Sequence, residues 1–297
     1  MNLPTIPAKT IVNKTKNAAW FGTDYTMNLY KGCCHGCIYC DSRSTCYGVH
    51  DFDTVRVKDD CLAIVRDDLR SKTHTGVVAT GAMSDPYNPF EQEMQYTRHA
   101  LELLCTYGFG VAIDTKSPLI TRDIDVLQEI QKMSPVLCKL TITTADDALA
   151  AKIEPHVAPS SARFSAMEAL AKNGLYTGVL LMPVLPFLED TPQNIHEIVS
   201  KTAAAGARFI YPMFGMTLRG NQHDYYLQKL EEIFPGEYLA QQYTKQFGNR
   251  YECHSPQAKR LWEQFRTECD ACGLLYKMQD IISDYQQGYG TNQLSFL

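Results

Sequence analysis

The chain has 297 residues, of which 45% are hydrophobic and 21% charged, and its formal net charge is -5. This composition is typical of a globular protein with a large core and excludes wholesale disorder. The negative net charge argues against a broadly basic surface that holds nucleic acid through phosphate contacts alone. Because no apolar run approaches the roughly 18 residues that span a bilayer, and the first residues do not resemble a signal peptide, we expect a cytoplasmic protein with no membrane partner.

Short β-branched runs alternate with amphipathic helical patterns along most of the chain. Six strands are expected at 26–30, 76–80, 110–115, 137–143, 177–182 and 207–213. Five intervening helices are expected at 59–70, 91–108, 122–133, 160–174 and 192–206. This alternation predicts parallel strands joined by right-handed crossovers. Because no G-x-G-x-x-G turn follows the first strand, the predicted fold class is α/β, a partial (βα)6 TIM-type barrel rather than a dinucleotide-binding sheet.

The strand pattern stops after about residue 217, where helical patterns take over. We therefore expect three regions: an N-terminal segment over 1–22, the barrel over 23–216, and a helical C-terminal extension over 217–297.

Cysteines are concentrated directly after the first expected strand. Four of the eleven fall in "NLYKGCCHGCIYCDSR", at Cys33, Cys34, Cys37 and Cys40. In the reducing cytosol, cysteines at such short spacing favour a metal or redox centre over a disulfide framework. If the strand ends near Tyr30, this cysteine loop lies at the carboxyl-terminal mouth of the sheet, where parallel α/β folds place their chemistry.

The spacing allows two ligand triplets, C-x3-C-x2-C from Cys33 or C-x2-C-x2-C from Cys34, both completed by Cys37 and Cys40. A structural zinc site needs a fourth ligand, for which the candidates are Cys46, His35 and His50. A four-iron cluster held by three cysteines would instead leave one iron open to a further ligand. This difference separates a structural or electron-transfer site from a reactive one.

The segment "GCCHGCIYC" resembles the G-C-x-H-G-C-x-Y-C loop of radical S-adenosylmethionine (SAM) enzymes related to spore photoproduct lyase, a DNA repair enzyme. The resemblance continues, in order, through "MSDPYNPFE", "TKSPLITRD", "LTITTADD", "IEPHVAPSSAR" and "GVLLMPVLP". It implies that Cys33, Cys37 and Cys40 bind a 4Fe-4S cluster, with Cys34 a bystander. It also implies that the open iron binds SAM, and that reduction by a donor such as a flavodoxin or ferredoxin generates a 5'-deoxyadenosyl radical.

The same resemblance implies a set of residues that contact SAM: Tyr39, Ser84, Asp85, Lys116, Thr141 and Arg163. Tyr39 would lie near the adenine, Ser84 and Asp85 near the amino group, and Lys116 near the carboxylate or a ribose hydroxyl. Each has a plainer alternative. A turn would account for Asp85, and packing or an ion pair with Glu154 would account for Arg163.

The sequence departs from spore photoproduct lyase at Ala82, where that enzyme has the cysteine that donates a hydrogen atom. A lyase reaction by the same route is therefore not expected. The sequence leaves two substrate classes open: a nucleic acid or nucleotide, and a protein or small metabolite. The alternative from another class is a non-catalytic iron–sulfur or zinc protein.

Three features of the C-terminal extension stay open. Cys253, Cys269 and Cys272 are candidates for a second metal, but the helical stripe around Cys269 and Cys272 favours a core face. The ending "QLSFL", 293–297, resembles the short peptides with which bacterial repair proteins bind the sliding clamp. The tyrosines and basic residues of the extension are either a base-stacking surface or core packing.

Overall fold

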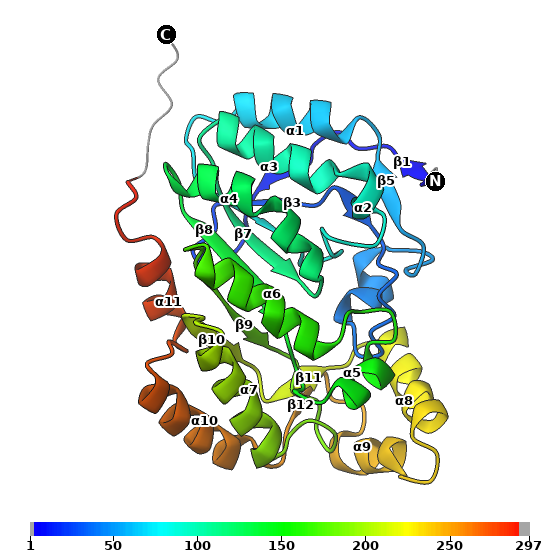
Figure 1. Ribbon diagram of the computed structural model, residues 1–297. Helices are drawn as coiled ribbons and strands as arrows, with labels where there is room; N and C mark the ends of the chain where they lie inside the picture. Colours follow the sequence, from blue (N-terminus) through cyan, green and yellow to red (C-terminus); the bar gives the residue numbers. More distant parts are fainter. Residues whose placement is uncertain (1–2, 291–297) are drawn as a thin grey trace.

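The computed structural model describes residues 3–290 and has a curved sheet with one row of helices along its outer side (Figure 1). Six parallel strands lie in the order in which they occur along the chain: β3 (Tyr25–Met27), β6 (Val77–Thr80), β7 (Gly110–Thr115), β8 (Val136–Thr141), β9 (Thr177–Leu181) and β10 (Phe209–Pro212). Because the order never reverses, successive crossovers stay on the same side of the sheet. The predicted α/β partial barrel is confirmed.

The outer helices come from the connections between strands. They are α1 (Cys61–Arg70), α2 (Glu91–Met94), α3 (Tyr96–Thr106), α4 (Ile124–Gln131), α5 (Asp147–Ile153), α6 (Ser160–Lys172) and α7 (Pro192–Ala204), with the 3-10 helix η3 (Pro118–Asp123) before α4. Their apolar stripes and the outward side chains of the strands form the main core. The single helix expected at 91–108 is in fact two, because Gln95 has a φ of 52°.

The first predicted strand, 26–30, needs correction. The first parallel strand ends at Met27 rather than near Tyr30, and β4 (Tyr30–Lys31) instead joins β5 (Arg56–Lys58) and β1 (Thr5–Ile6) in a small second sheet. The segment before the barrel also supplies β2 (Val12–Lys14), which pairs antiparallel with β3 and covers that edge of the main sheet.

The lower part of the inner face of the sheet is closed by apolar residues from both ends of the chain. Phe21 and the helix α11 (Met278–Tyr285) pack there against inward side chains of the parallel strands. The hydroxyl of Tyr285 donates a hydrogen bond to the carbonyl of Phe21 over 2.5 Å. The upper part of the inner face, towards the carboxyl ends of the strands, is left for the site.

The C-terminal extension divides into two parts. Beyond the strand mouth lie α8 (Asn221–Ile233) and α9 (Leu239–Phe247), which connect the two antiparallel strands β11 (Gly215–Thr217) and β12 (Glu252–His254). Helix α10 (Ala258–Cys272) then returns to pack beside α7, continuing the outer row (Figure 1). Within residues 3–290 no helix is long and apolar enough to cross a membrane. The segment 293–297 lies outside the described residues.

Candidate active site

The cysteine loop, 32–40, is fixed at several points by backbone and side-chain hydrogen bonds. Cys33 N–H donates to the Phe52 carbonyl over 2.8 Å, and Ile38 N–H donates to the Ile153 carbonyl over 3.0 Å. Gly32 has a φ of +84°, and a Cβ there would lie 2.3 Å from the Thr54 carbonyl oxygen. Only glycine therefore fits where the loop leaves the small sheet.

The cysteine loop has two faces, each lining a different cavity. Cys33, Cys37 and Cys40 line one cavity of about 100 Å³ together with the carboxyl ends of β6, β7 and β8, which we name the inner cavity. Cys34 instead lines a larger cavity of about 610 Å³ on the other side of the loop, which we name the outer cavity. The structure therefore groups the three thiols that the family resemblance selects and separates Cys34 from them.

The ionisation of these thiols differs with their surroundings. Burial raises the pKa of Cys33, but a hydrogen bond and the charge of His35 lower it more, so the net pKa lies below its ordinary value. Burial raises the pKa of Cys37 and of Cys40, and the nearby Lys116 ammonium offsets only part of this effect. Burial raises the pKa of Cys34 to about 11, which leaves it a neutral thiol at pH 7.

Four of the six residues expected to contact SAM line the inner cavity: Ser84, Asp85, Lys116 and Thr141. Ser84 follows β6 and donates a hydrogen bond from Oγ to the Gly32 carbonyl over 2.5 Å, which joins the strand end to the cysteine loop. Thr141 ends β8, and its side chain is buried beside the thiols. The mouth of the sheet thus brings together residues that are far apart in the sequence.

Asp85 holds two strand ends together. Its Oδ1 accepts hydrogen bonds from the Thr115 hydroxyl over 2.7 Å and from the Tyr87 N–H over 2.8 Å, and its Oδ2 accepts one from the Lys116 N–H over 2.8 Å. The bond to Tyr87 is the turn that the sequence alternative describes. His35 Nδ1 lies 3.6 Å from Oδ2, so Asp85 also faces the cysteine loop.

Lys116 presents an ammonium without a carboxylate partner among the described residues. It is half-buried, and its Nζ lies 5.7 Å from the centre of the Tyr39 ring. Burial lowers its pKa, but negative charge at Cys37 and Glu154 raises it by more, so the net pKa is above its ordinary value. A positive charge placed beside three thiols suits a cavity that receives anionic groups.

Tyr39 and Arg163 lie outside the set of residues that line the inner cavity, and both bond to Glu154. The Tyr39 hydroxyl donates to one carboxylate oxygen of Glu154, and Arg163 Nη2 donates to the other. Arg163 also donates to the Thr141 carbonyl over 3.0 Å and to the Ala158 carbonyl over 2.8 Å. The expected pairing with Glu154 is present, and it ties the last part of the cysteine loop to the end of β8.

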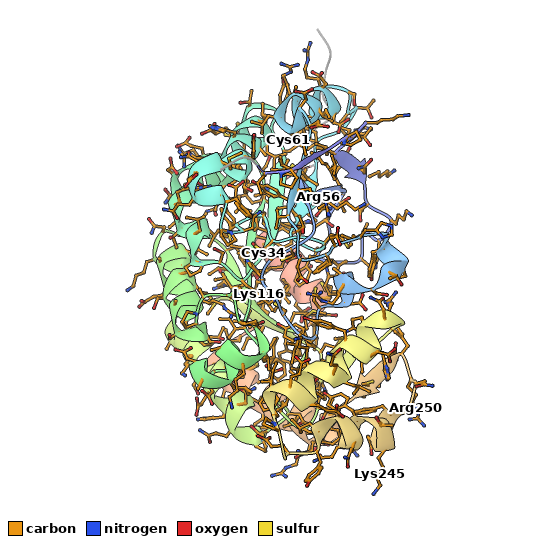
Figure 2. All side chains as sticks on the ribbon, turned by 90° about the vertical axis from the view of Figure 1, so that its right-hand side faces the viewer. Cys34, Arg56, Cys61, Lys116, Lys245 and Arg250 are labelled. Atoms are coloured by element: carbon orange, nitrogen blue, oxygen red, sulfur yellow. The ribbon has the colours of Figure 1, made fainter. Side chains whose placement is uncertain are left out.

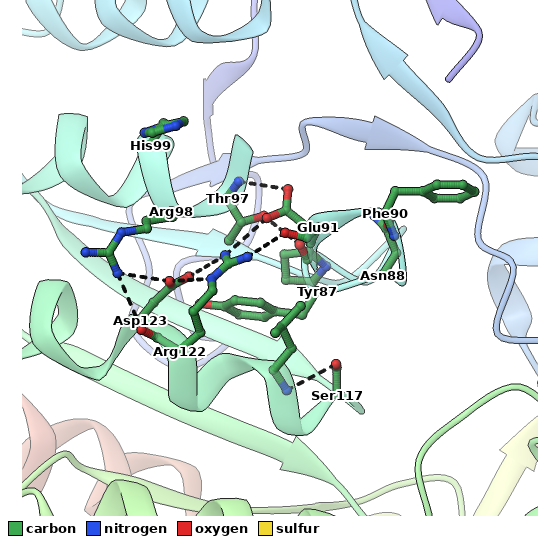
Figure 3. A network of polar contacts seen from close by, with 12 residues as sticks. Tyr87, Asn88, Phe90, Glu91, Thr97, Arg98, His99, Ser117, Arg122 and Asp123 are labelled. Carbon is green, nitrogen blue, oxygen red and sulfur yellow. Dashed lines mark hydrogen bonds and ion pairs between the residues drawn. The ribbon is translucent and has the colours of Figure 1, made fainter. Parts of the chain in front are cut away.

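A second polar network supports the segment "DPYNPFE" from behind, as Figure 3 shows. Arg122 bonds to Asp123 Oδ1 over 2.7 Å and lies 3.3 Å from Glu91 Oε2, and both carboxylates are fully buried. Glu91 also accepts hydrogen bonds from Tyr30 and from the Thr97 N–H, while Arg98 lies 3.2 Å from Asp123. The Thr97 hydroxyl also donates to the Pro86 carbonyl over 2.5 Å, which joins the network to the turn that follows Asp85.

We expect Arg122→Met to lower the free energy of unfolding by about 2 to 3 kcal/mol, because it leaves two buried carboxylates without their main cation. Urea unfolding of the purified protein measures the change. Arg66→Met is the matched control: Arg66 pairs with Asp67 on an exposed surface, and its loss should leave stability unchanged. Equal stability of the Arg122 variant and the native chain would contradict the role given to the network.

Sequence analysis missed three groups at the site. Asp114 points inward from β7 into the inner cavity, and Lys139 on β8 lies 2.8 Å from its Oδ1 and is fully buried. Gly81 has a φ of +107°, and a Cβ there would lie 1.9 Å from the Asp114 carbonyl oxygen. Alternation along a strand puts Asp114 on the same face as Ala112, and Lys139 on the same face as Leu137. No local signal in the sequence indicates that the two charged side chains pair.

The described residues contain no group of three or more His, Cys, Asp or Glu side chains placed to hold a single metal ion. Cys253 and Cys269 are buried in separate apolar clusters, which confirms core packing for these two. The same expectation is wrong for Cys272, which is exposed on the last turn of α10. A four-iron cube is a different case from a single ion, because each thiolate binds its own iron at a separate corner.

Comparison with known proteins identifies the family. A family model described as the Radical SAM superfamily matches residues 27–199, which include the cysteine loop and the parallel strands up to β9. The chain belongs to the radical SAM superfamily. An uncharacterized protein of Mycobacterium tuberculosis is 32% identical to this radical SAM protein over 234 residues, covering 76% of the chain and 68% of the relative. An uncharacterized protein of Methanocaldococcus jannaschii is 31% identical over 195 residues, which cover 65% of this chain and 71% of the relative.

Solved structures share the fold of this radical SAM protein. Spore photoproduct lyase complexed with dinucleoside spore photoproduct matches with a TM-score of 0.65 at 18% identity, covering 92% of this chain and 80% of that one. A second match is the radical SAM methyltransferase TsrM of Kitasatospora setae, solved with cobalamin and a 4Fe-4S cluster bound. Its TM-score is 0.54 at 12% identity, and the match covers 85% of this chain and 52% of TsrM.

Proposed function

We propose that the chain is a radical SAM enzyme in which Cys33, Cys37 and Cys40 bind a 4Fe-4S cluster. The observation that carries the proposal is the shared inner cavity, where these three thiols meet Lys116 and the strand ends. The thiols fit the group because three side chains converge while Cys34 faces away. When bound and reduced, the cluster supplies the electron that cleaves SAM to methionine and a 5'-deoxyadenosyl radical, which removes a hydrogen atom from the substrate.

The surrounding residues have separate tasks in this proposal. Lys116 offers its ammonium to an anionic group such as the carboxylate of SAM, since no carboxylate of the described residues forms an ion pair with it. The hydroxyls of Ser84 and Thr141 face the same space. Asp85, Tyr39 and Arg163 position them, because most of their hydrogen-bonding capacity is taken by the protein itself. The buried walls keep water from a reactive intermediate.

We propose a nucleic acid or nucleotide as the substrate class. Support comes from the fold shared with spore photoproduct lyase and from exposed aromatic and basic residues near the mouth, where Arg219 lies over the rings of Tyr47 and Tyr251. Tyr226 and Tyr243 do not contribute to such a surface, because both are buried in the extension. With Ala82 in place of a hydrogen-donating cysteine, the product radical must be quenched by another route.

One anaerobic experiment tests the activity. The protein is reconstituted with iron and sulfide, reduced with dithionite and given SAM, and 5'-deoxyadenosine is measured. We expect about four irons per chain and formation of 5'-deoxyadenosine. A bound cluster whose EPR signal is unchanged by SAM, with no cleavage, would instead favour a non-catalytic iron–sulfur protein. One zinc per chain and no iron would favour the structural zinc alternative.

The final residues suggest a further partner. We propose that 293–297 bind the bacterial sliding clamp through Leu294 and Phe296, which would place the enzyme at sites of DNA synthesis or repair. Deleting 293–297 should abolish pull-down by the clamp, whereas unchanged binding, or no binding by the full chain, would remove this partner.

The loop after β9 carries a pH-dependent group. Burial raises the pKa of Glu189 to about 8, although hydrogen bonds from the Thr143 hydroxyl and the Leu185 N–H lower it in part. The folded chain therefore keeps a proton that the unfolded chain loses above pH 4.5, so the free energy of unfolding falls as pH rises from about 4.5 to 8.

We expect Glu189→Gln to remove this dependence. Between pH 5 and pH 8, the native chain should lose roughly 3 kcal/mol of unfolding free energy more than the variant, because glutamine cannot ionise. Urea unfolding of both proteins at the two pH values measures the difference. Parallel pH profiles for the two proteins would show that Glu189 titrates normally.

A further inference from the structure

The three thiols that line the inner cavity are held by different parts of the chain. On one side, Cys33 N–H donates to the Phe52 carbonyl, shortly before β5. In the middle of the loop, Ile38 N–H donates to the Ile153 carbonyl at the end of α5. The third thiol, Cys40, ends the cysteine loop on the side where the C-terminal extension meets the barrel. Its support therefore has to be sought in the extension.

The C-terminal extension packs directly on this end of the cysteine loop. Figure 2 shows the extension, marked by Lys245 and Arg250, below the site, which is marked by Cys34 and Lys116. Cys40 packs against an apolar cluster that combines loop and extension residues: Cys37, Ile38, Tyr39, Met216, Leu218, Tyr226 and Leu230. This packing brings polar groups of the extension within hydrogen-bond distance of the residues beside Cys40.

A buried amide joins α8 to the peptide bond that leads into Cys40. Gln222, the second residue of α8, is fully buried, and its Nε2 donates to the Tyr39 carbonyl over 3.1 Å. Its Oε1 accepts the Arg219 N–H over 3.1 Å, so both ends of the amide are engaged and its direction is fixed. Because the Tyr39 carbonyl belongs to the peptide bond before Cys40, this contact sets the orientation of that peptide.

The residue after Cys40 is held by the same short stretch of the extension. Asp41 Oδ1 lies 3.1 Å from Arg219 Nε and accepts a hydrogen bond from the Thr217 hydroxyl over 3.2 Å. The Asp41 and Arg219 side chains are both partly exposed, so this pair lies at the surface end of the contact, whereas Gln222 lies at the buried end. Both chain neighbours of Cys40 are thus bonded to the extension.

These contacts also place a hydrogen-bond donor on the Cys40 sulfur. Asp41 opens the 3-10 helix η1 (Asp41–Arg43), and the backbone N–H of the next residue, Ser42, bonds to the Cys40 thiol. Burial raises the pKa of this thiol, and the Lys116 ammonium and the Ser42 N–H lower it in part. Hydrogen bonds to ligating sulfurs help to set the properties of an iron–sulfur cluster. Groups that hold Asp41 in place therefore act on the sulfur as well.

We propose that Gln222 and Arg219 are positioning residues for Cys40. They act through Tyr39 and Asp41, which flank Cys40, and not by contact with SAM or substrate. The extension is then a working part of the site, because it holds one of the three cluster ligands. This inference rests on the proposed function for the cluster itself, whereas the position of the thiol can be measured without any cluster.

The first test uses the cluster-free, full-length protein and the alkylating probe iodoacetamide. In Gln222→Met and in Arg219→Met, Cys40 should be alkylated about fivefold faster than in the native chain, because a bond that restrains it is lost. Cys33, which is held from the other side, should react at its native rate. Mass spectrometry of the loop peptide identifies the alkylated cysteine.

Two further variants serve as controls for this test. Gln242→Met makes the same substitution on α9, where the exposed Gln242 side chain bonds only to the Glu237 carbonyl among the described residues, and it should leave the rate at Cys40 unchanged. Arg219→Lys should lie closer to the native chain than Arg219→Met, because an ammonium can still pair with Asp41.

The second test uses the protein after anaerobic reconstitution with iron and sulfide. The cluster of Gln222→Met and of Arg219→Met should lose iron to a chelator about tenfold faster than the native cluster, as for other losses of a group that orients a metal ligand. The EPR signal of the reduced cluster should also differ from the native signal before SAM is added, because the Ser42 N–H no longer keeps its place on the Cys40 sulfur.

The alkylation rates decide the proposal. Equal rates at Cys40 in the native chain and in both variants would overturn it, and so would equal acceleration at Cys33 and Cys40, which is the result of a general loosening. If Gln222→Met does not fold, the partly exposed Arg219→Met substitution decides alone. If the native chain binds no cluster while the variants expose Cys40 selectively, the proposed function fails and the positioning of Cys40 stands.

Discussion

Cys33→Ser should abolish assembly of the iron–sulfur cluster, whereas Cys34→Ser should leave it intact, although the two residues are adjacent. The reason is their orientation: Cys33 lines the inner cavity with Cys37 and Cys40, and Cys34 lines the outer cavity. Loss of one of three thiolates leaves two ligands for four irons, too few to hold the cube in reducing solution. Iron and sulfide content after anaerobic reconstitution measures the result.

The matched pair makes this test independent of folding. Both substitutions replace sulfur by oxygen at neighbouring, half-buried positions, so a general effect on the loop would lower iron content in both variants. Cys37→Ser and Cys40→Ser should behave like Cys33→Ser. Iron retained by the Cys33 variant but lost from the Cys34 variant would select the C-x2-C-x2-C triplet and assign the cluster to the opposite register.

Five of the six barrel strands, β6 to β10, could be predicted close to their observed bounds because each is a short run rich in apolar and β-branched residues between turn signals. The break in the helix at Gln95 could not, since no glycine or proline marks it. Glu91, at the start of α2, accepts the Thr97 N–H over 2.9 Å and binds Arg122 from η3, so contacts distant in sequence stabilise the break. Strand β2 likewise depends on Asp68, which accepts the N–H groups of Ile11 and Val12.

At the site, too, features set by neighbouring residues could be predicted from the sequence, whereas features set by tertiary contacts could not. The spacing of the cysteines narrows the ligands to two triplets, and the resemblance chooses one of them. The spacing of residues in the sequence does not indicate that Asp114 pairs with Lys139 inside the barrel. It also does not indicate that the cysteine loop has two faces. Both follow from side-chain directions on curved strands and on a loop bent by Gly32 and Gly36. The groups that surround Lys116, such as Cys37 and Glu154, similarly become its neighbours only in the folded chain, where the strand ends meet.

Arg163→Met should destabilise the protein by about 3 to 5 kcal/mol, the largest change in stability expected at the site. Arg163 is 1% exposed and bonds to Glu154 and to the carbonyls of Ala158 and Thr141. Methionine fills part of the volume but leaves the buried Glu154 carboxylate with only the Tyr39 hydroxyl. Urea unfolding of the cluster-free protein measures the change without contribution from iron.

A second substitution separates charge from packing. Because the main cost is an uncompensated carboxylate, Arg163→Met combined with Glu154→Gln should recover a large part of the lost stability, whereas Glu154→Gln alone should be mildly destabilising. If the double variant is as unstable as Arg163→Met, the loss comes from packing and the two carbonyl bonds. Recovery of stability with weakened SAM binding would show that the Tyr39, Glu154 and Arg163 chain positions the cysteine loop and the end of β8 for the cofactor as well as stabilising the fold.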